Sequence, residues 1–124
     1  MNVVPRVEPL RFASVEKVIE RLKPAEPVYL LHPGRFQAAA KRFLDSFPGD
    51  TLYAVKCNPD PSVLRAIWAG GVRHFDCASP AEIALVRSMF PDARIHFMHP
   101  IKTRGAIREA WTRHDVHDFV LDSA

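Results

Sequence analysis

The sequence predicts an α/β fold in which parallel strands alternate with helices. The main observation is a repeat: an apolar strand, a polar turn and an amphipathic helix follow one another three times, and a fourth strand ends the series. The predicted strands are "TLYAVK" (51–56), "RHFD" (73–76), "RIHFM" (94–98) and "DFVLD" (118–122). Strand starts at such regular intervals are typical of βα units that feed a parallel sheet.

Each of the three intervening helices has a start signal. Asp60 precedes Pro61 at the start of the first helix, and Thr103 precedes the third, so both are expected N-caps. Ser79 and Glu82 match the S-x-x-E capping box at the start of the second helix. These signals support the helix assignments independently of the apolar periodicity.

The first fifty residues predict a helix, a short strand and a second helix. "SVEKVIERL" (14–22) begins with a good N-cap and has apolar residues at helical spacing, and "VYLL" (28–31) is a strand candidate. The apolar face expected for the helix in "PGRFQAAAKRFLDSF" (33–47) consists of Phe36, Ala40, Phe43, Leu44 and Phe47. We interpret residues 1–26 as an N-terminal extension and residues 27–124 as the repeat-containing domain.

The repeat can close in two ways, as a doubly wound sheet or as a (β/α)8 barrel. A doubly wound sheet usually has a glycine-rich phosphate turn after its first strand, but "KCNPDPS" contains no glycine. A barrel gathers functional side chains at the carboxyl ends of its strands, and polar residues stand at these ends here: Lys56, Asp76, His99 and Asp122. We therefore predict a partial TIM barrel of about four βα units. Since a full barrel needs about 250 residues, we expect this chain to form about half of one, as a truncated barrel.

Composition favours a globular protein and excludes several function classes. The chain has 124 residues, of which 48% are hydrophobic and 25% charged. Its net charge of +3 comes from basic residues that alternate with acids, so we expect no nucleic-acid partner. No apolar run approaches the length of a membrane span, so we expect no membrane partner and a cytoplasmic location. Cys57, Cys77 and the six histidines form no recognisable ligand set, so no metal site is predicted.

Lys56 is the most informative single residue. A primary amine at a strand end inside a barrel mouth is partly desolvated, which favours its neutral, nucleophilic form, as chemistry with an aldehyde cofactor requires. The alternative is a lysine that extends to solvent at an ordinary strand terminus.

Three motifs resemble a known family. "YAVKCNPDPSVLRAI", "FDCASPAEIALV" and "HPIK", in this order, resemble the start of the alanine-racemase-like barrel of the fold-type III pyridoxal-phosphate decarboxylases, the ornithine/lysine/diaminopimelate/arginine decarboxylase family. The resemblance extends over roughly residues 27–124 and implies that the chain is the amino-terminal half of such a protein. It also implies that Lys56 holds pyridoxal 5'-phosphate as an internal aldimine and that Asp76 lies near the cofactor.

The neighbouring residues leave alternatives open. Asp76 is expected either at the cofactor or in a hydrogen bond to the turn before the next helix. Glu82 matches a family position near the active site, but its capping-box spacing explains it without chemistry. Cys57 and Cys77 are interpreted as small buried apolar residues. His99 departs from the family's N-P-x-K pattern and is interpreted as a polar residue with its hydrogen bonds satisfied.

The resemblance also implies a function. "VKCN" and "DCAS" are most similar to the ornithine or lysine/ornithine branch, which implies that a small basic amino acid loses CO2 through an external aldimine to give a polyamine-pathway amine. A homodimer is implied for the full-length enzyme. The phosphate-binding, ring-nitrogen and proton-donor residues would lie beyond residue 124, so the chain alone is expected to be inactive. The alternatives are a non-catalytic homologue, a pyridoxal-phosphate-carrying partner subunit, and an unrelated binding module in which Lys56 is structural.

Overall fold

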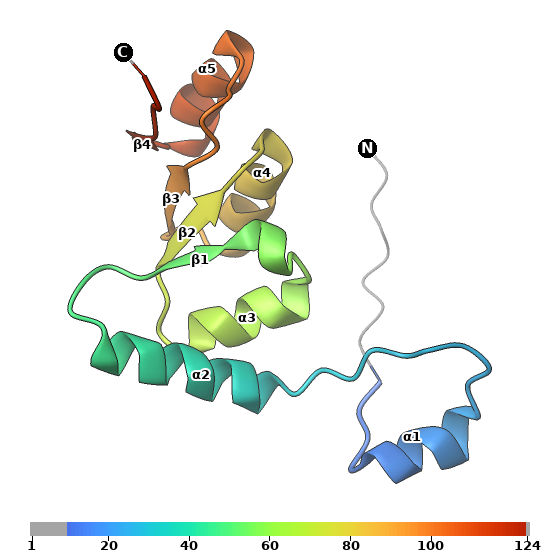
Figure 1. Cartoon of the computed structure of the whole chain (residues 1–124). Coiled ribbons are helices and arrows are strands. Elements are labelled where there is room, and N and C mark those ends of the chain that lie inside the picture. Colours follow the sequence, from blue (N-terminus) through green and yellow to red (C-terminus); the bar gives the residue numbers. More distant parts are fainter. Residues whose placement is uncertain (1–9, 124) are drawn as a thin grey trace. The chain divides into compact units, whose positions relative to one another are not determined.

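A computed structural model describes residues 10–123. The chain divides into two compact units, residues 1–30 and 31–124 (Figure 1). In the first unit, helix α1 (Val15–Leu22) begins where the Ser14 side chain accepts a hydrogen bond from the Lys17 backbone N–H, as predicted. It ends at Lys23, which adopts a left-handed conformation. The boundary expected between residues 26 and 27 stays a prediction.

The second unit is built on a parallel sheet of four strands in the order β1-β2-β3-β4. The strands are β1 (Leu52–Ala54), β2 (His74–Cys77), β3 (Arg94–Phe97) and β4 (Asp118–Phe119). Between them lie α3 (Pro61–Ala69), α4 (Pro80–Met89) and α5 (Arg104–His114), while α2 (Pro33–Ser46) precedes β1. The predicted series of three βα units and a fourth strand is confirmed.

Within the part of the chain that the structure describes, the sheet has one face covered by helices and one helix-free face. Along β2 and β3, Phe75, Cys77, Ile95 and Phe97 are buried, whereas the residues that alternate with them are not. Helices α3, α4 and α5 lie along one side of the sheet (Figure 1). Consecutive parallel strands with their helices on one face continue into a barrel, whereas a doubly wound sheet reverses its strand order and has helices on both faces. The partial-barrel prediction is therefore confirmed.

The helix start signals act as the sequence predicts. The Asp60 carboxylate accepts from the Ser62 N–H at 2.7 Å, and the Thr103 hydroxyl accepts from the Ala106 N–H at 3.1 Å. Each bond satisfies a backbone donor that the first helical turn leaves without a partner. These caps fix the points at which α3 and α5 begin after β1 and β3.

The strand predicted in "VYLL" (28–31) is wrong. These residues form no regular structure, and Tyr29 is 97% exposed. A strand requires a neighbour for its backbone hydrogen bonds, and the only strand paired with β1 among the described residues is β2. The last predicted strand, 118–122, is also shorter than expected, because β4 pairs with β3 only through Asp118 and Phe119.

The apolar face predicted for α2 is only partly buried. Ala40 is in the core and Leu44 packs against it, but Phe43 and Phe47 are 53% and 48% exposed and stack on each other. The α2–α3 contact is close at Gly70, where a Cβ atom would lie 2.7 Å from the Ala40 Cβ. This contact covers only one side of α2, so its two exposed phenylalanines have no cover.

The apolar residues of helix α5 are also only partly buried. Ala110 is buried, but the apolar residues Ile107 and Trp111 of the same helix are 37% and 55% exposed. The Trp111 ring instead meets the His117 ring edge to face, at 4.5 Å between centroids. Among the described residues, no helix is long and apolar enough to cross a membrane.

Candidate functional site

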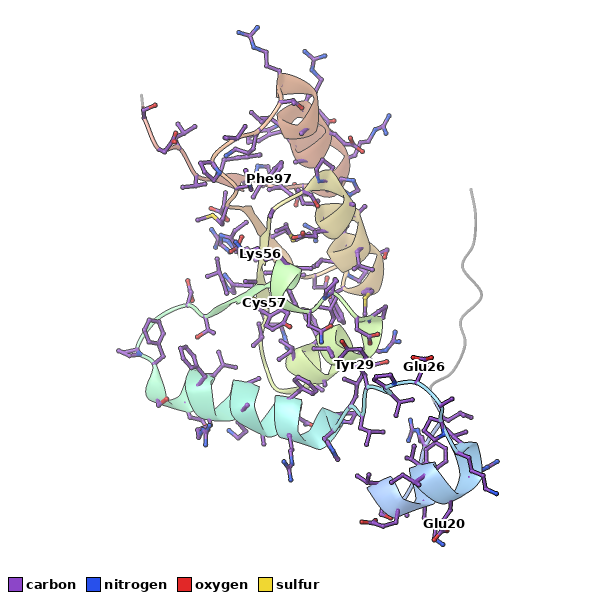
Figure 2. All side chains as sticks on the ribbon, turned by 45° about the vertical axis from the view of Figure 1, so that its right-hand side comes forward. Glu20, Glu26, Tyr29, Lys56, Cys57 and Phe97 are labelled. Carbon is purple, nitrogen blue, oxygen red and sulfur yellow. The ribbon has the colours of Figure 1, made fainter. Side chains whose placement is uncertain are left out.

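The carboxyl edge of the sheet begins with a short turn that carries Lys56. Strand β1 ends at Ala54, and the chain passes into the 3-10 turn η1 (Val55–Cys57), which contacts β2. Figure 2 labels Lys56 and Cys57 on this turn. The predicted strand end at residue 56 is therefore two residues too late, because the backbone tightens into η1 before Lys56.

The Lys56 side chain is exposed. The expected partial desolvation of Lys56 is wrong within residues 10–123: β1 is the edge strand of the described sheet, and Lys56 is exposed although its neighbour Val55 is buried. Over this range, the lysines whose ammonium groups donate hydrogen bonds are Lys17, Lys41 and Lys102. Lys56 is not among them, so its amine is available to an incoming group.

Asp76 lies at the same edge of the sheet. It is the register partner of Ala54, and η1 follows Ala54 directly, so Asp76 and Lys56 stand at the carboxyl ends of neighbouring strands. The turn after β2 is capped by Ser79, whose hydroxyl accepts from the Glu82 N–H at 3.3 Å, and by Glu82, whose carboxylate accepts from the Ala78 N–H at 2.8 Å. Asp76 takes no part in these bonds, so the turn-capping alternative does not describe it. Glu82 therefore acts as a helix-capping residue, as its spacing predicts, although its carboxylate accepts from Ala78, the residue before the N-cap Ser79.

The two cysteines occupy opposite environments. Cys57 is exposed, so its interpretation as a buried residue is wrong. It follows Lys56 at the exposed end of η1. Cys77 is completely buried, and burial raises its pKa to about 12, with smaller contributions from the negative charges of Glu82 and Asp76.

Thiol labelling tests this difference. We expect iodoacetamide at about pH 7.5 to alkylate Cys57 in the folded chain and Cys77 only after unfolding, because the thiolate is the nucleophile and must be accessible. Mass spectrometry of the two cysteine peptides measures the modified fractions. Cys57→Ser is expected to remove the rapid reaction, whereas equal rates for the two native thiols would contradict the assigned burial.

His99 lies in the loop after β3 and is exposed. Its Nδ1 is 3.2 Å from the Ile101 N and 2.9 Å from the Ile101 O, so its ring interacts with its own loop. Lys102 donates hydrogen bonds to the backbone carbonyls of His99, Pro100 and Val120. This ammonium group therefore links the loop after β3 to the end of β4. Asp122, the last predicted strand-end group, is exposed beyond β4.

A polar network that the sequence motifs did not predict lies on the helix-free face of the sheet. The His74 Nδ1 lies 3.0 Å from the His96 Nε2, and the His96 Nδ1 lies 3.5 Å from an Asp118 carboxylate oxygen. The Arg94 guanidinium completes the network with hydrogen bonds to both Asp118 oxygens, at 2.9 and 3.3 Å. Period-two alternation could have found it, since it places these residues opposite the apolar residues of β2, β3 and β4.

The network makes stability depend on pH. Burial lowers the pKa of His96 below its ordinary value of 6.5, although the carboxylates of Asp118 and Asp50 oppose this, while the charges of His74 and Arg94 reinforce it. At His96 the unfolded chain therefore binds protons more readily than the folded chain. The contribution of His96 to stability is complete above pH 6.5 and is lost as the pH falls through and below that value. The pKa of Asp118 is also lowered, mainly by the Arg94 hydrogen bond, so acid below its ordinary 3.8 removes further stability.

Urea unfolding at several pH values tests this dependence. Between about pH 7.5 and about pH 5 we expect the unfolding free energy to fall by about 1 kcal/mol or less from His96. His96→Gln is expected to remove this part of the dependence, whereas His32→Gln, a change at an exposed histidine with no side-chain cap bond, is expected to keep it. An unchanged pH dependence in His96→Gln would contradict the assignment.

Comparison with known proteins identifies the domain that carries this edge. The family described as "Pyridoxal-dependent decarboxylase, pyridoxal binding domain" matches residues 33–124, from the start of α2 to the end of the chain. The chain belongs to this family. The family resemblance inferred from the three motifs is thereby confirmed, as is pyridoxal phosphate as the cofactor of this pyridoxal-binding domain.

Individual relatives are ornithine decarboxylases. The chain is 51% identical to that of Saccharomyces cerevisiae over 61 residues, which are 48% of this chain and 13% of the relative. It is 41% identical to the chloroplastic enzyme of Nicotiana glutinosa over 85 residues (66% and 19%) and 40% identical to that of Leishmania donovani over 93 residues (71% and 13%). The chain thus matches about a fifth or less of the length of these relatives. No solved structure gives a significant match.

The described edge of the pyridoxal-binding domain fits an aldehyde cofactor. It presents an exposed primary amine, Lys56, that is not committed to a hydrogen bond, and a half-buried carboxylate, Asp76, on the neighbouring strand. An amine that is free of such bonds can form the carbon–nitrogen bond that anchors pyridoxal phosphate in its enzymes.

Proposed function

We propose that this chain is the cofactor-anchoring part of a pyridoxal-phosphate-dependent amino-acid decarboxylase and that Lys56 carries the cofactor. The observation that supports this most strongly is the position of Lys56 on η1, at the carboxyl end of the first strand in a pyridoxal-binding domain. In barrels of this class, functional groups gather at the carboxyl ends of the strands. The Lys56 Nζ would hold the cofactor through a carbon–nitrogen bond to its aldehyde carbon, with the aldehyde oxygen leaving as water.

Asp76 is proposed as the second cofactor-site residue. A carboxylate beside Lys56 can attract the ammonium form and accept hydrogen bonds from the bound group. Its position as the register partner of Ala54 supports this role, because only Val55 lies between Ala54 and Lys56. The bonds that cap α4 come from Ser79 and Glu82, which leaves the Asp76 carboxylate available.

The substrate is proposed to be ornithine or lysine. The cysteine-containing motifs "VKCN" and "DCAS" and the names of the relatives support this choice. The cofactor ring, when bound, accepts the electron pair that remains at Cα when the carboxylate leaves as CO2. Lys56 would hold the cofactor when no substrate is bound. We further propose a homodimeric, cytoplasmic whole protein, with residues 1–26 as an extension to the barrel that starts at residue 27.

Reductive trapping tests the proposal. The full chain is incubated with pyridoxal phosphate, reduced with borohydride, digested and analysed by mass spectrometry. We expect the stable pyridoxyl mass on the peptide that contains Lys56, well above the labelling of Lys17, Lys23 and Lys41. Equal labelling of all exposed lysines would contradict it.

Release of labelled CO2 from carboxyl-labelled ornithine tests the catalytic part separately. Turnover would support a decarboxylase. Specific labelling of Lys56 without turnover would instead support a cofactor-anchoring part that does not decarboxylate by itself.

A further inference from the structure

The turn that carries Lys56 is closed by a side-chain hydrogen bond. The Tyr53 hydroxyl on β1 donates to the Asn58 backbone carbonyl at 3.2 Å, so the bond joins the residues on either side of Ala54 and η1. The N-cap of η1, Ala54, supplies no side-chain cap bond. A 3-10 turn of three residues has poor hydrogen-bond geometry of its own, and the Tyr53 bond adds a restraint across it.

The Tyr53 ring is held by the core. It meets the Phe75 ring edge to face, with 6.4 Å between centroids and 77° between planes, and the two residues are register partners on β1 and β2. Phe75 is completely buried. Burial, the main cause, and the charge of Cys57 raise the pKa of the Tyr53 hydroxyl, so it keeps its proton and remains a donor at neutral pH.

The acceptor side is also fixed. The Asn58 side-chain oxygen accepts from the Asp60 N–H at 3.1 Å, and the Asp60 carboxylate caps α3 through the Ser62 N–H at 2.7 Å. Tyr53, Asn58 and Asp60 therefore form a continuous connection from the sheet to the first turn of α3. Val55, completely buried, anchors the start of η1 from inside. The backbone on both sides of Lys56 is thus restrained, while its side chain is exposed.

We propose that Tyr53 is a positioning residue for Lys56: its hydroxyl holds η1 in the conformation that presents the lysine amine at the carboxyl edge of the sheet. The proposal rests on the proposed function, because it concerns the same amine. Loss of the hydroxyl leaves the ring packing intact and frees the Asn58 carbonyl to turn toward water. The turn then samples conformations in which Lys56 does not meet the cofactor aldehyde.

The test is Tyr53→Phe in the full chain, with the rate of reductive pyridoxyl labelling measured at each lysine. We expect the rate at Lys56 to fall roughly two- to tenfold, the size expected for one lost hydrogen bond, while the rate at Lys41 stays constant. The matched control is Tyr29→Phe, which removes the same hydroxyl from a residue that is 97% exposed. It is expected to label as the wild type does. Thermal unfolding of both variants separates a local effect from loss of the fold.

The outcomes distinguish the two proposals. If wild-type Lys56 labels no faster than Lys41, the proposed function fails. If wild-type Lys56 labels specifically and Tyr53→Phe labels it at the same rate, the positioning role of Tyr53 is overturned. An equal change at Lys56 and Lys41, accompanied by a lower unfolding temperature, also overturns it, because a general loss of structure would then account for the result.

Discussion

Replacement of Lys56 by arginine or methionine is expected to reduce specific pyridoxyl labelling of this domain to background. A primary amine is the only side-chain group here that can form the reducible carbon–nitrogen bond with an aldehyde, and neither replacement supplies one. Arginine keeps a positive charge on η1, so it separates covalent anchoring from electrostatic attraction of the cofactor phosphate. Methionine keeps much of the side-chain length without charge.

Both replacements are expected to leave the fold intact. Lys56 is exposed and takes no part in the Tyr53–Asn58 hydrogen bond that holds η1, so replacing its side chain removes no buried contact. Surface substitutions of this kind usually change the unfolding free energy by less than about 0.5 kcal/mol. Thermal unfolding should therefore give the same midpoint for the variants and the wild type.

The matched control is Lys41→Met. Lys41 is an exposed lysine on α2 whose ammonium group pairs with Asp45 at 3.0 Å, far along the chain from η1. Its replacement is expected to remove one weakly labelled site and to leave the Lys56 peptide unchanged. Specific labelling that persists in both Lys56 variants, on another lysine and at the wild-type amount, would assign the anchor to that residue instead.

The elements whose signals are local could be predicted from the sequence. The caps at Ser14, Asp60, Ser79 and Thr103 all act as expected, because a cap bond depends only on residues within the same turn. The parallel order of β1 to β4 also followed, since regularly spaced strands with intervening helices leave few alternatives.

Burial that depends on packing against elements far away in the sequence could not be predicted from local signals. Phe43, Phe47 and Trp111 have helical apolar spacing yet are exposed, because spacing shows which face of a helix is apolar and not whether another element covers it. The segment 28–31 has strand composition, but no strand among residues 10–123 pairs with it.

The candidate site shows the same division. The motif identified Lys56 and Asp76, and the register of β1 and β2 brings them to one edge. The 3-10 turn, the exposure of Cys57 and the hydrogen bond from Tyr53 to Asn58 depend on how the backbone bends after Ala54. No local signal in "YAVKCN" indicates that bend, because the apolar pattern alone continues the strand through residue 56.

The second large effect is expected from Phe75→Ala, which should destabilise the domain by about 3–5 kcal/mol. Phe75 is completely buried on the covered face of β2. Its ring lies 6.3 Å from that of Trp68 and 5.6 Å from that of Phe90, both stacked, and Trp68 and Phe90 stack on each other at 4.6 Å. Alanine leaves a cavity between α3 and α4 that these large rings cannot fill without leaving their own positions.

Urea unfolding measures this loss, with Phe47→Ala as the matched control. Phe47 is 48% exposed, so the same truncation there removes far less buried surface and is expected to cost about 1 kcal/mol or less. Similar losses for the two variants would contradict the assigned core. The Phe75 ring also supports Tyr53. At a low temperature, where Phe75→Ala remains folded, we therefore expect the pyridoxyl labelling rate at Lys56 to fall relative to wild type by more than the rate at Lys41 does. The aromatic core of α3, α4 and β2 thus determines how firmly the cofactor-anchoring turn is held.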